Sequence, residues 1–195
     1  QMMRSISGTV DAARQAADIT ETNVTVVDSD FTSRSMGMIV KEAAKAAQEG
    51  KTVEEILEIV EDAKKRTTLY LTVVNLDNLI KGGRISQVMG MFSNLLNIKL
   101  FLQVINGKIE IIQKGRGLKS LQKKYDEIFE QMKATPNGIQ EIGIMHAGLS
   151  DFNEGNIARV RELFHDVPLT IVTTSPIIMS HTGVDAMAIT YLENK

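Results

Sequence analysis

The sequence contains no cysteine in its 195 residues, which excludes a disulfide framework, a thiolate metal site and a cysteine nucleophile. Tryptophan is also absent, and aromatic residues make up only 5% of the chain. No apolar run reaches the roughly 20 residues that a membrane-spanning helix needs. Residues 1–9 lack the apolar stretch of a signal peptide. We therefore expect a cytoplasmic protein that is not stably inserted in a membrane.

A charge excess of either sign is lacking too, because 22 basic residues face 24 acidic ones and the net charge is −2. Such a balance gives no general attraction to nucleic acid or to an acidic membrane. Basic residues do cluster between Lys114 and Lys124, but no aromatic side chains are interleaved with them to stack on bases. The cluster is typical of a solvated helix face, and we expect no nucleic-acid partner.

Methionine, in contrast, is frequent, with 10 residues. Its flexible side chain fills irregular apolar space. The overall hydrophobic content of 43% is ordinary for a soluble globular protein. Two interpretations of the methionines stay open: an ordinary aliphatic core, or the lining of a site for a long apolar ligand.

The first 74 residues alternate between helical and extended patterns. The predicted elements are a helix over 10–19, a strand over 23–28, a helix over 33–48, a helix from Thr52, and a strand over 67–74. Thr52 and Glu55 have the spacing of a capping box at the start of their helix. Strands separated by helices favour a parallel sheet covered by helices.

From about Asn75 the pattern changes to a second α/β unit with a mixed sheet. The predicted elements are helices over 76–80, 86–97, 118–132 and 153–164, and strands over 98–105, 108–114, 141–146, 169–173 and 186–192. The dipeptide Asn106-Gly107 lies between two apolar runs, which is a strong hairpin signal.

The stretch Leu79–Ser86 is the most informative motif. Its two glycines permit backbone angles that are closed to other residues, and they let another segment approach closely. Ser86 can cap the following helix, whose free amide groups attract anions, and Arg84 can grip a phosphate or carboxylate with two bonds. The alternative is a plain helix-loop-helix linker with a solvent-facing arginine. The spacing of a phosphate-binding P-loop is missing.

Two further stretches could hold an anion. His181 lies between Ser180 and Thr182, and its imidazole can donate a hydrogen bond near neutral pH; a purely structural histidine is the alternative. The hydroxyls and amides of Arg4–Thr9, at the start of a helix, could form an anion site or could simply cap the helix. The three histidines show no metal-ligand spacing, so we expect no metal.

Together these stretches resemble the DegV family. Leu79–Ser86 closely resembles its "L.KGGRIS" signature, and His181-Thr182-Gly183 stands where the family has "HTGPG". The other matching segments are Val26–Ser29 with Ser35–Gly37 ("VDS…S.G"), Leu95–Lys99 with Gly107–Ile109 ("LLNIKP…DG.I"), and Lys114–Leu121 ("K.R..KKAL"). The matches run in order along essentially the whole chain.

The resemblance implies a two-lobed α/β fold that holds a fatty acid between two domains. Residues 1–74 would be the C-terminal part of the first domain, with preceding βα units missing, and residues 75–195 the second domain. Some members of the family are the binding subunit of bacterial fatty acid kinase. They present the acyl carboxylate to a separate ATP-using partner, which makes acyl phosphate for phospholipid synthesis. The implied protein is a carrier of long-chain fatty acid with a kinase partner, without catalysis of its own and without a cofactor.

The resemblance also implies the ligand residues. His181 would bind the carboxylate with Thr182 as its neighbour, and Arg84 would lie at the mouth of the site for the partner or the phosphate. The remaining expected site residues are Ser5, Ser7, Gly8, Thr9, Gly83 and Ile85. One alternative is a stand-alone enzyme on a phosphorylated or acyl substrate, with Arg84 as anion clamp and His181 as general acid. A second alternative is a ligand-free regulatory module.

The chain departs from the family pattern at three places. Met3–Ile6 fills the space where the family has a Ser-Ser pair, and Leu100 replaces a proline. Val184-Asp185 replaces the Pro-Gly of "HTGPG". A carboxylate facing the ligand would repel it, so we expect Asp185 to point away from the site.

Overall fold

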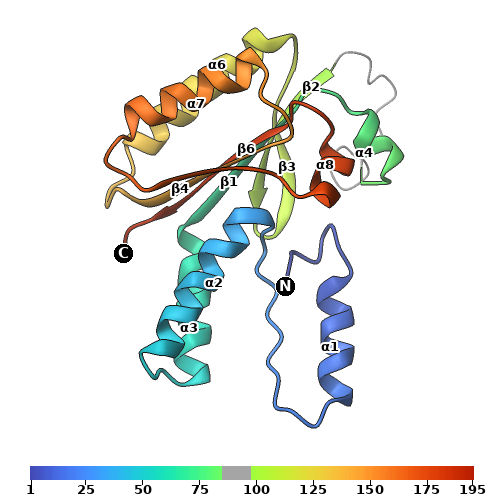
Figure 1. The fold of residues 1–195 in the computed structure, drawn as a ribbon, viewed down its shortest axis with the longest axis vertical. Helices are drawn as coiled ribbons and strands as arrows, with labels where there is room; N and C mark the ends of the chain where they lie inside the picture. The colour runs from blue at the N-terminus through green and yellow to red at the C-terminus, as the bar shows by residue number, and fades with distance from the viewer. Residues whose placement is uncertain (85–97) are drawn as a thin grey trace.

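A six-stranded mixed sheet organises the chain, with helices against both of its faces (Figure 1). The computed structural model describes residues 1–84 and 98–195. In chain order its elements are α1 (Thr9–Ile19), α2 (Ser33–Gln48), α3 (Val53–Arg66), β1 (Thr67–Val73), α4 (Asp77–Lys81), β2 (Ile98–Ile105), β3 (Lys108–Arg116), α6 (Leu118–Lys133), β4 (Ile139–His146), α7 (Asp151–Leu163), β5 (Leu169–Thr173), α8 (Pro176–Thr182) and β6 (Met187–Glu193).

The strands lie in the order β3-β2-β1-β6-β4-β5. β4 and β5 run parallel, whereas the other neighbouring pairs are antiparallel, so the predicted mixed sheet is confirmed. β1 lies in the middle of this sheet, between β2 and β6. It therefore packs with the strands that follow it, although the sequence placed residues 67–74 in the first domain. The division of the chain into two domains stays a prediction.

The β2–β3 hairpin follows from its turn residues. Asn106 and Gly107 have φ angles of 49° and 70°. A two-residue turn with both residues in this left-handed region matches the twist of the flanking strands, and Asn-Gly adopts it readily. The predicted hairpin is confirmed.

One face of the sheet is covered by α6 and α7, which bury the main hydrophobic core. Tyr125 of α6 lies near its centre. Its ring meets that of Phe101 edge to face at 4.8 Å between centroids, and its hydroxyl is 3.0 Å from the hydroxyl of Thr72 in β1. This face thus closes around side chains from β1, β2 and α6.

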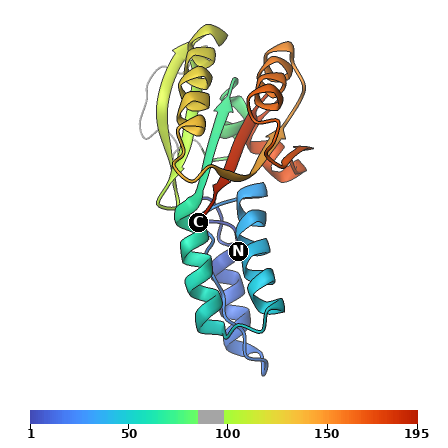
Figure 2. The same cartoon turned by 90° about the vertical axis from the view of Figure 1, so that its left-hand side faces the viewer.

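The opposite face is contacted by α2 and α3 through a second apolar cluster. Two polar links fix α2 to the sheet: Ser35 Oγ lies 2.8 Å from Thr190 Oγ1, and Lys41 Nζ lies 2.8 Å from both carboxylate oxygens of the buried Glu141. From these links α2 and α3 extend beyond the end of the sheet, and α1 runs beside them (Figures 1 and 2).

The predicted strand over Asn23–Asp28 is wrong, and with it the parallel sheet expected in the first 74 residues. The segment is extended, as its β-branched residues favour, but it is not part of a sheet. A strand needs a neighbour to pair with. Gln1–Met3 runs beside it and beyond, joined by main-chain hydrogen bonds to Val27, Ser29 and Phe31, but these bonds do not build a strand.

Local helix signals were reliable. The capping box of α3 is present: Thr52 Oγ1 accepts from the Glu55 amide at 3.2 Å, and the Glu55 carboxylate accepts from the Thr52 amide at 2.8 Å. The helix predicted over 86–97 lies outside the described residues. Across 1–84 and 98–195, the helices are all too short or too polar to cross a bilayer.

Candidate functional site

The motif Lys81-Gly82-Gly83-Arg84 forms the end of α4. The amide of Gly83 donates to the carbonyl of Ile80, and that of Arg84 donates to Leu79, both at 3.0 Å. Gly83 has a φ of 71°. This pattern is a Schellman motif, in which the residue after the helix cap takes the left-handed conformation that glycine adopts most easily. The second glycine of the motif is therefore explained by its backbone angle.

The first glycine of the motif has a different role. Gly82 has an ordinary φ of −77° and ψ of −5°, which any residue could adopt. A β-carbon built on Gly82, however, would lie 2.9 Å from Cε1 of His181 and would overlap Nδ1 still more closely. The imidazole thus rests on the bare α-carbon of Gly82. Two motifs about a hundred residues apart, each predicted to form part of the site, meet at this contact.

His181 and Thr182 are the last two residues of α8, a helix that the sequence did not predict. Pro176 occupies its first turn, and Gly183 ends it with a φ of 78°. His181 is half-buried; its Nδ1 is shielded from solvent and lacks a hydrogen-bond partner in the described part of the chain. Thr182 is buried, and its hydroxyl donates to the Ile178 carbonyl at 3.1 Å. Thr182 therefore lies beside the site with its proton already engaged.

A small apolar pocket lies between α8 and the sheet, next to Thr182. Its volume is about 40 Å³. The lining residues come from α8, from β1, β4 and β6, and from the start of α2: Thr32, Ser33, Leu69, Leu71, Met145, Thr174, Ile178, Thr182, Ala186 and Ala188. Ligand sites for small molecules usually enclose roughly 300–1,000 Å³. The pocket is apolar as an acyl site requires, but it is nearly closed.

The predicted residues Ser5, Ser7 and Gly8 lie in the turn before α1, and Thr9 is the first residue of that helix. Ser7 Oγ accepts from the Thr9 amide at 3.3 Å and donates to Thr9 Oγ1 at 3.1 Å, while Gly8 occupies the N-cap position. Ser5 Oγ is shielded and has no hydrogen-bond partner among the described residues. Ser7 and Thr9 thus form hydrogen bonds with each other, whereas the Ser5 hydroxyl forms none with the described residues.

This turn and His181 are not in direct hydrogen-bond contact within residues 1–84 and 98–195. Thr32, which lines the pocket at Thr182, connects that pocket to the N-terminal segment, because its hydroxyl lies 3.1 Å from Met2 Sδ. In Figure 1 the turn at the top of α1 faces the end of the molecule that carries α4 and α8. The structure brings His181, Thr182 and Gly82 together, and among the described residues no hydrogen bond joins Ser5 or Ser7 to them.

Arg84 folds back over the glycine turn. Its Nη1 donates to the Gly82 carbonyl at 2.9 Å, which holds the half-buried guanidinium near the Gly82–His181 contact. This place is compatible with the expected position at the mouth of the site. Ile85, also predicted as a site residue, lies outside the described residues.

Asp185 has a φ of 62°, in the left-handed region. Its Oδ1 lies 2.9 Å from where a β-carbon on Gly148 would be, so the carboxylate lies against the loop that follows β4.

The two other histidines lie elsewhere in the sequence. His165 is exposed, and its Nδ1 lies 2.9 Å from Asp166 Oδ1. His146 ends β4, and its buried Nδ1 also has no hydrogen-bond partner among the residues that the structure describes. The described residues contain no cluster of acidic and histidine side chains able to hold a metal.

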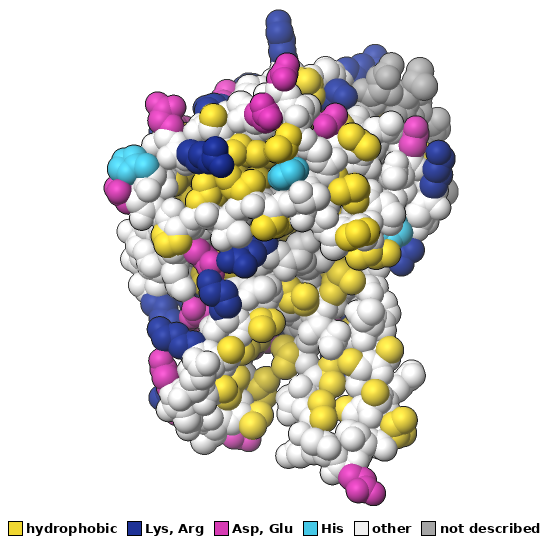
Figure 3. Space-filling view, in the orientation of Figure 1, with side chains coloured by type: hydrophobic (Ala, Val, Ile, Leu, Met, Phe, Trp, Pro, Cys, Tyr) yellow, Lys and Arg dark blue, Asp and Glu magenta, His cyan; other side chains and the backbone are white. Residues whose placement is uncertain are grey.

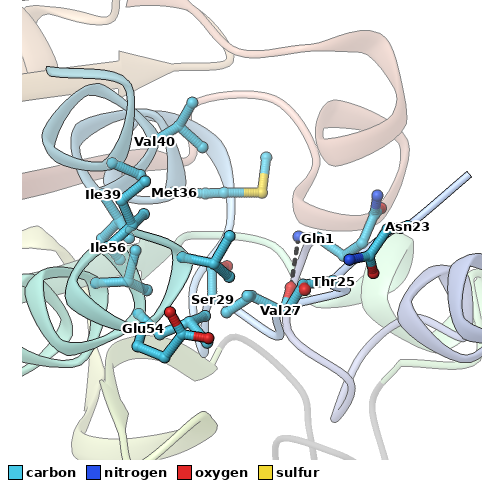
Figure 4. Close-up of a pocket in the computed structure, with 14 residues that line it drawn as sticks. Gln1, Asn23, Thr25, Val27, Ser29, Met36, Ile39, Val40, Glu54 and Ile56 are labelled. Carbon is cyan, nitrogen blue, oxygen red and sulfur yellow. Dashed lines mark hydrogen bonds between the residues drawn. The ribbon is translucent and has the colours of Figure 1, made fainter. Parts of the chain in front are cut away.

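A larger groove lies away from these residues, between α2, α3 and the extended segment 23–29 (Figure 4). It measures about 600 Å³ and is lined mainly by aliphatic side chains, among them Val27, Met36, Ile39 and Ile56. Figure 3 shows it as an indentation at the lower end of the molecule, with hydrophobic side chains along it. None of the predicted site residues that the structure describes lines this groove.

Sequence reasoning missed one residue that contacts the site, Asn78 of α4. Its Nδ2 donates to the Ser180 carbonyl at 3.0 Å. An isolated asparagine in a short helix gives no signal for such a contact, because the partner lies 102 positions away.

The chain matches known proteins along nearly its whole length. Residues 2–194 match the family described as "Uncharacterised protein, DegV family". A DegV domain-containing protein of Streptococcus pneumoniae serotype 4 is 42% identical over 188 residues, covering 96% of this chain and 66% of that protein. One of Listeria innocua is 39% identical over 191 residues, covering 97% and 67%. The chain thus spans about two thirds of the length of these relatives.

Solved structures share the fold. One described as "Fatty Acid Binding of a DegV family Protein from Thermus thermophilus" has a TM-score of 0.80 at 28% identity, covering 99% of this chain and 69% of that one. A fatty acid binding DegV family protein from Streptococcus agalactiae has a TM-score of 0.84 at 25% identity, covering 99% and 68%. The sequence motifs, the mixed sheet and these matches agree: the chain belongs to the DegV family.

Proposed function

We propose that the protein binds a long-chain fatty acid, with the carboxylate at His181 and the acyl chain between α8 and the sheet. The observation that carries the proposal is the environment of His181: its Nδ1 is shielded and has no hydrogen-bond partner among residues 1–84 and 98–195, and the next residue, Thr182, lines an apolar pocket. A buried polar atom without a partner is costly unless a ligand satisfies it. Solved relatives described as fatty-acid-binding proteins support this assignment.

The acyl chain supplies most of the binding free energy. Each buried methylene contributes about 0.8 kcal/mol, so a sixteen-carbon chain could gain on the order of 10 kcal/mol before the costs of ordering. The pocket at Thr182 holds about 40 Å³. We therefore infer that the chain enters by displacing side chains between α8 and the sheet. The carboxylate then needs only a few hydrogen bonds, but without them its burial would be very costly.

We further propose that the protein is a cytoplasmic carrier that presents the carboxylate to a separate kinase. Resemblance to the binding subunit of fatty acid kinase supports this role. Arg84 lies over the Gly82 turn, and its guanidinium is of the kind that binds a phosphate with two hydrogen bonds. Arg84→Ala should leave fatty-acid affinity nearly unchanged and slow acyl phosphate formation by the partner kinase. A normal rate of acyl phosphate formation with this variant would show that Arg84 has no role in the reaction with the kinase.

The central experiment measures fatty acid in the intact protein. Denaturing mass spectrometry of the purified protein should release a long-chain fatty acid, and a titration with oleate should give a saturable affinity. His181→Ala should weaken that affinity by roughly 10-fold or more, since it removes a hydrogen bond to a charged group. The control is His165→Ala, because His165 is exposed and does not line the pocket at Thr182. Protein that neither carries nor binds a fatty acid, or equal affinity in both variants, would contradict the proposal.

A further inference from the structure

Asn78 of α4 donates a hydrogen bond to the end of α8. Its Nδ2 lies 3.0 Å from the carbonyl oxygen of Ser180, the residue immediately before His181. The last carbonyls of a helix have no partner within that helix. α8 has seven residues, which is too few for a helix to be stable alone. The Asn78 amide therefore supplies a link that the end of α8 cannot make for itself.

The same side chain also contacts the residue on the far side of His181 and Thr182. Gly183 ends α8, and a β-carbon built on it would lie 3.2 Å from Asn78 Oδ1. The amide therefore packs directly on the backbone of Gly183. The Asn78 side chain brackets the two predicted ligand residues, with its nitrogen at Ser180 and its oxygen side at Gly183.

The main chain of Asn78 holds the other half of the site. Its carbonyl accepts from the amide of Gly82 at 2.8 Å, and Gly82 is the residue on which the His181 ring rests. Asn78 is thus joined to the helix that carries the imidazole through its side chain. Through its backbone it is joined to the glycine that the imidazole contacts. A substitution of the side chain breaks the first link and leaves the second intact.

We propose that Asn78 is a positioning residue that acts through His181: its amide holds α8 so that the imidazole stays against Gly82 and meets the fatty-acid carboxylate. This inference rests on the proposed function, since it assumes a carboxylate at His181. Asn78 itself does not touch the ligand in this arrangement. Its effect on binding is therefore expected to disappear once the imidazole is removed.

A double-mutant cycle on the intact protein tests this dependence. Asn78→Ala should weaken oleate binding roughly 5-fold, the usual effect of one lost hydrogen bond. Asn78→Asp should weaken it at least as much, because an ionised carboxylate cannot donate to the Ser180 carbonyl. In the His181→Ala background, Asn78→Ala should have no further effect. Losses that multiply would mean that Asn78 acts independently of His181, which overturns the proposal.

Ser180→Ala is the matched control. The Ser180 hydroxyl donates to the Ile177 carbonyl at 2.9 Å, whereas Asn78 binds the main-chain carbonyl of Ser180. The control therefore alters the same turn of α8 and keeps the Asn78 link. It should bind oleate as the wild type does. A loss equal to that of Asn78→Ala would show that any disturbance of α8 has the same effect, and would overturn a specific role for Asn78.

A measurement without ligand separates this inference from the proposed function. The ring nitrogen resonances of His181, observed by NMR in ligand-free protein, should shift in Asn78→Ala and stay unchanged in Ser180→Ala. Unchanged resonances in Asn78→Ala overturn the positioning role whether or not the protein binds fatty acid. If the resonances shift but the wild type does not bind oleate, the positioning role stands and the proposed function fails.

Discussion

The imidazole of His181 occupies the space that a side chain on Gly82 would need. A β-carbon there would lie 2.9 Å from Cε1 of the ring and 2.9 Å from the Asn78 carbonyl oxygen. The backbone of Gly82 is open to any residue, so space and not conformation requires the glycine. For Gly83 the reverse holds: its φ is 71°, and a β-carbon built on it would have no atom of the described residues within 4 Å. Two adjacent glycines of one motif are thus needed for different physical reasons.

This difference gives a matched pair of variants. Gly82→Ala should push the imidazole off its place and weaken oleate binding about 10-fold, the range of a lost charge-assisted hydrogen bond. Gly83→Ala should cost about 1 kcal/mol of stability, because alanine is strained at positive φ, and should keep the affinity. Oleate titration and urea unfolding of both variants measure the two effects. Wild-type affinity in Gly82→Ala would show that the imidazole contact has no part in binding.

Sequence signals that involve few residues predicted the fold well. The capping box of Thr52 and Glu55 and the turn at Asn106-Gly107 each depend on neighbours in the chain, and both were confirmed. The strand at 23–28 was wrong because pairing depends on a partner that the local pattern cannot supply. α8 escaped prediction because its seven residues are fewer than periodicity can identify.

The site was predictable only in part, because its contacts join residues that lie far apart in the sequence. The two motifs that meet at Gly82 and His181 were both identified from the sequence, but not the contact between them. The Asn78 link was missed because it joins residues 102 positions apart. The direction of the Thr182 hydroxyl, which donates within its own helix, could not be inferred from residue types.

Two variants that add the same volume at different places test where the acyl chain lies. Ala188 lines the pocket at Thr182, and Ala43 lines the larger groove between α2 and α3. Ala188→Leu should fill the smaller pocket and reduce oleate affinity about 5-fold or more, in line with the roughly 1–3 kcal/mol that overpacking costs. Ala43→Leu should leave the affinity nearly unchanged. The opposite result would place the acyl chain in the groove of Figure 4.

The replacement of the family's glycine by Asp185 has a backbone consequence. Aspartate tolerates its φ of 62° better than most residues do, whereas a β-branched residue does not. Asp185→Val should therefore lower the free energy of unfolding by roughly 1–2 kcal/mol, and Asp185→Gly should be tolerated. Because the carboxylate lies against Gly148, Asp185→Gly should also keep oleate affinity. A large gain in affinity on removing this carboxylate would show that it faces the ligand after all.

Because of the ion pair between Lys64 and Asp30, the free energy of unfolding should decrease at alkaline pH. Lys64 Nζ lies 2.6 Å from Asp30 Oδ2 and 2.9 Å from Glu61 Oε1. Burial lowers the pKa of Lys64, but the bonds to Asp30 and Glu61 outweigh it, so the pKa is raised above its ordinary value. Because the pKa of Lys64 is higher in the folded protein than in the unfolded chain, the ion pair stabilises the fold fully at pH values below the unfolded-state pKa. This stabilisation is lost as the pH rises through the folded-state pKa.

Lys64→Met should therefore lower the free energy of unfolding at pH 7, by no more than about 1 kcal/mol because Asp30 is partly open to solvent. The difference from wild type should shrink above about pH 10.5, where lysine begins to lose its proton. Lys65→Met, at the exposed neighbouring position, is the control and should change little at either pH. Urea unfolding at pH 7 and near pH 11 measures both. A difference that stays constant, or grows, with pH would mean that Lys64 stabilises α3 through its aliphatic stem and not through its charge.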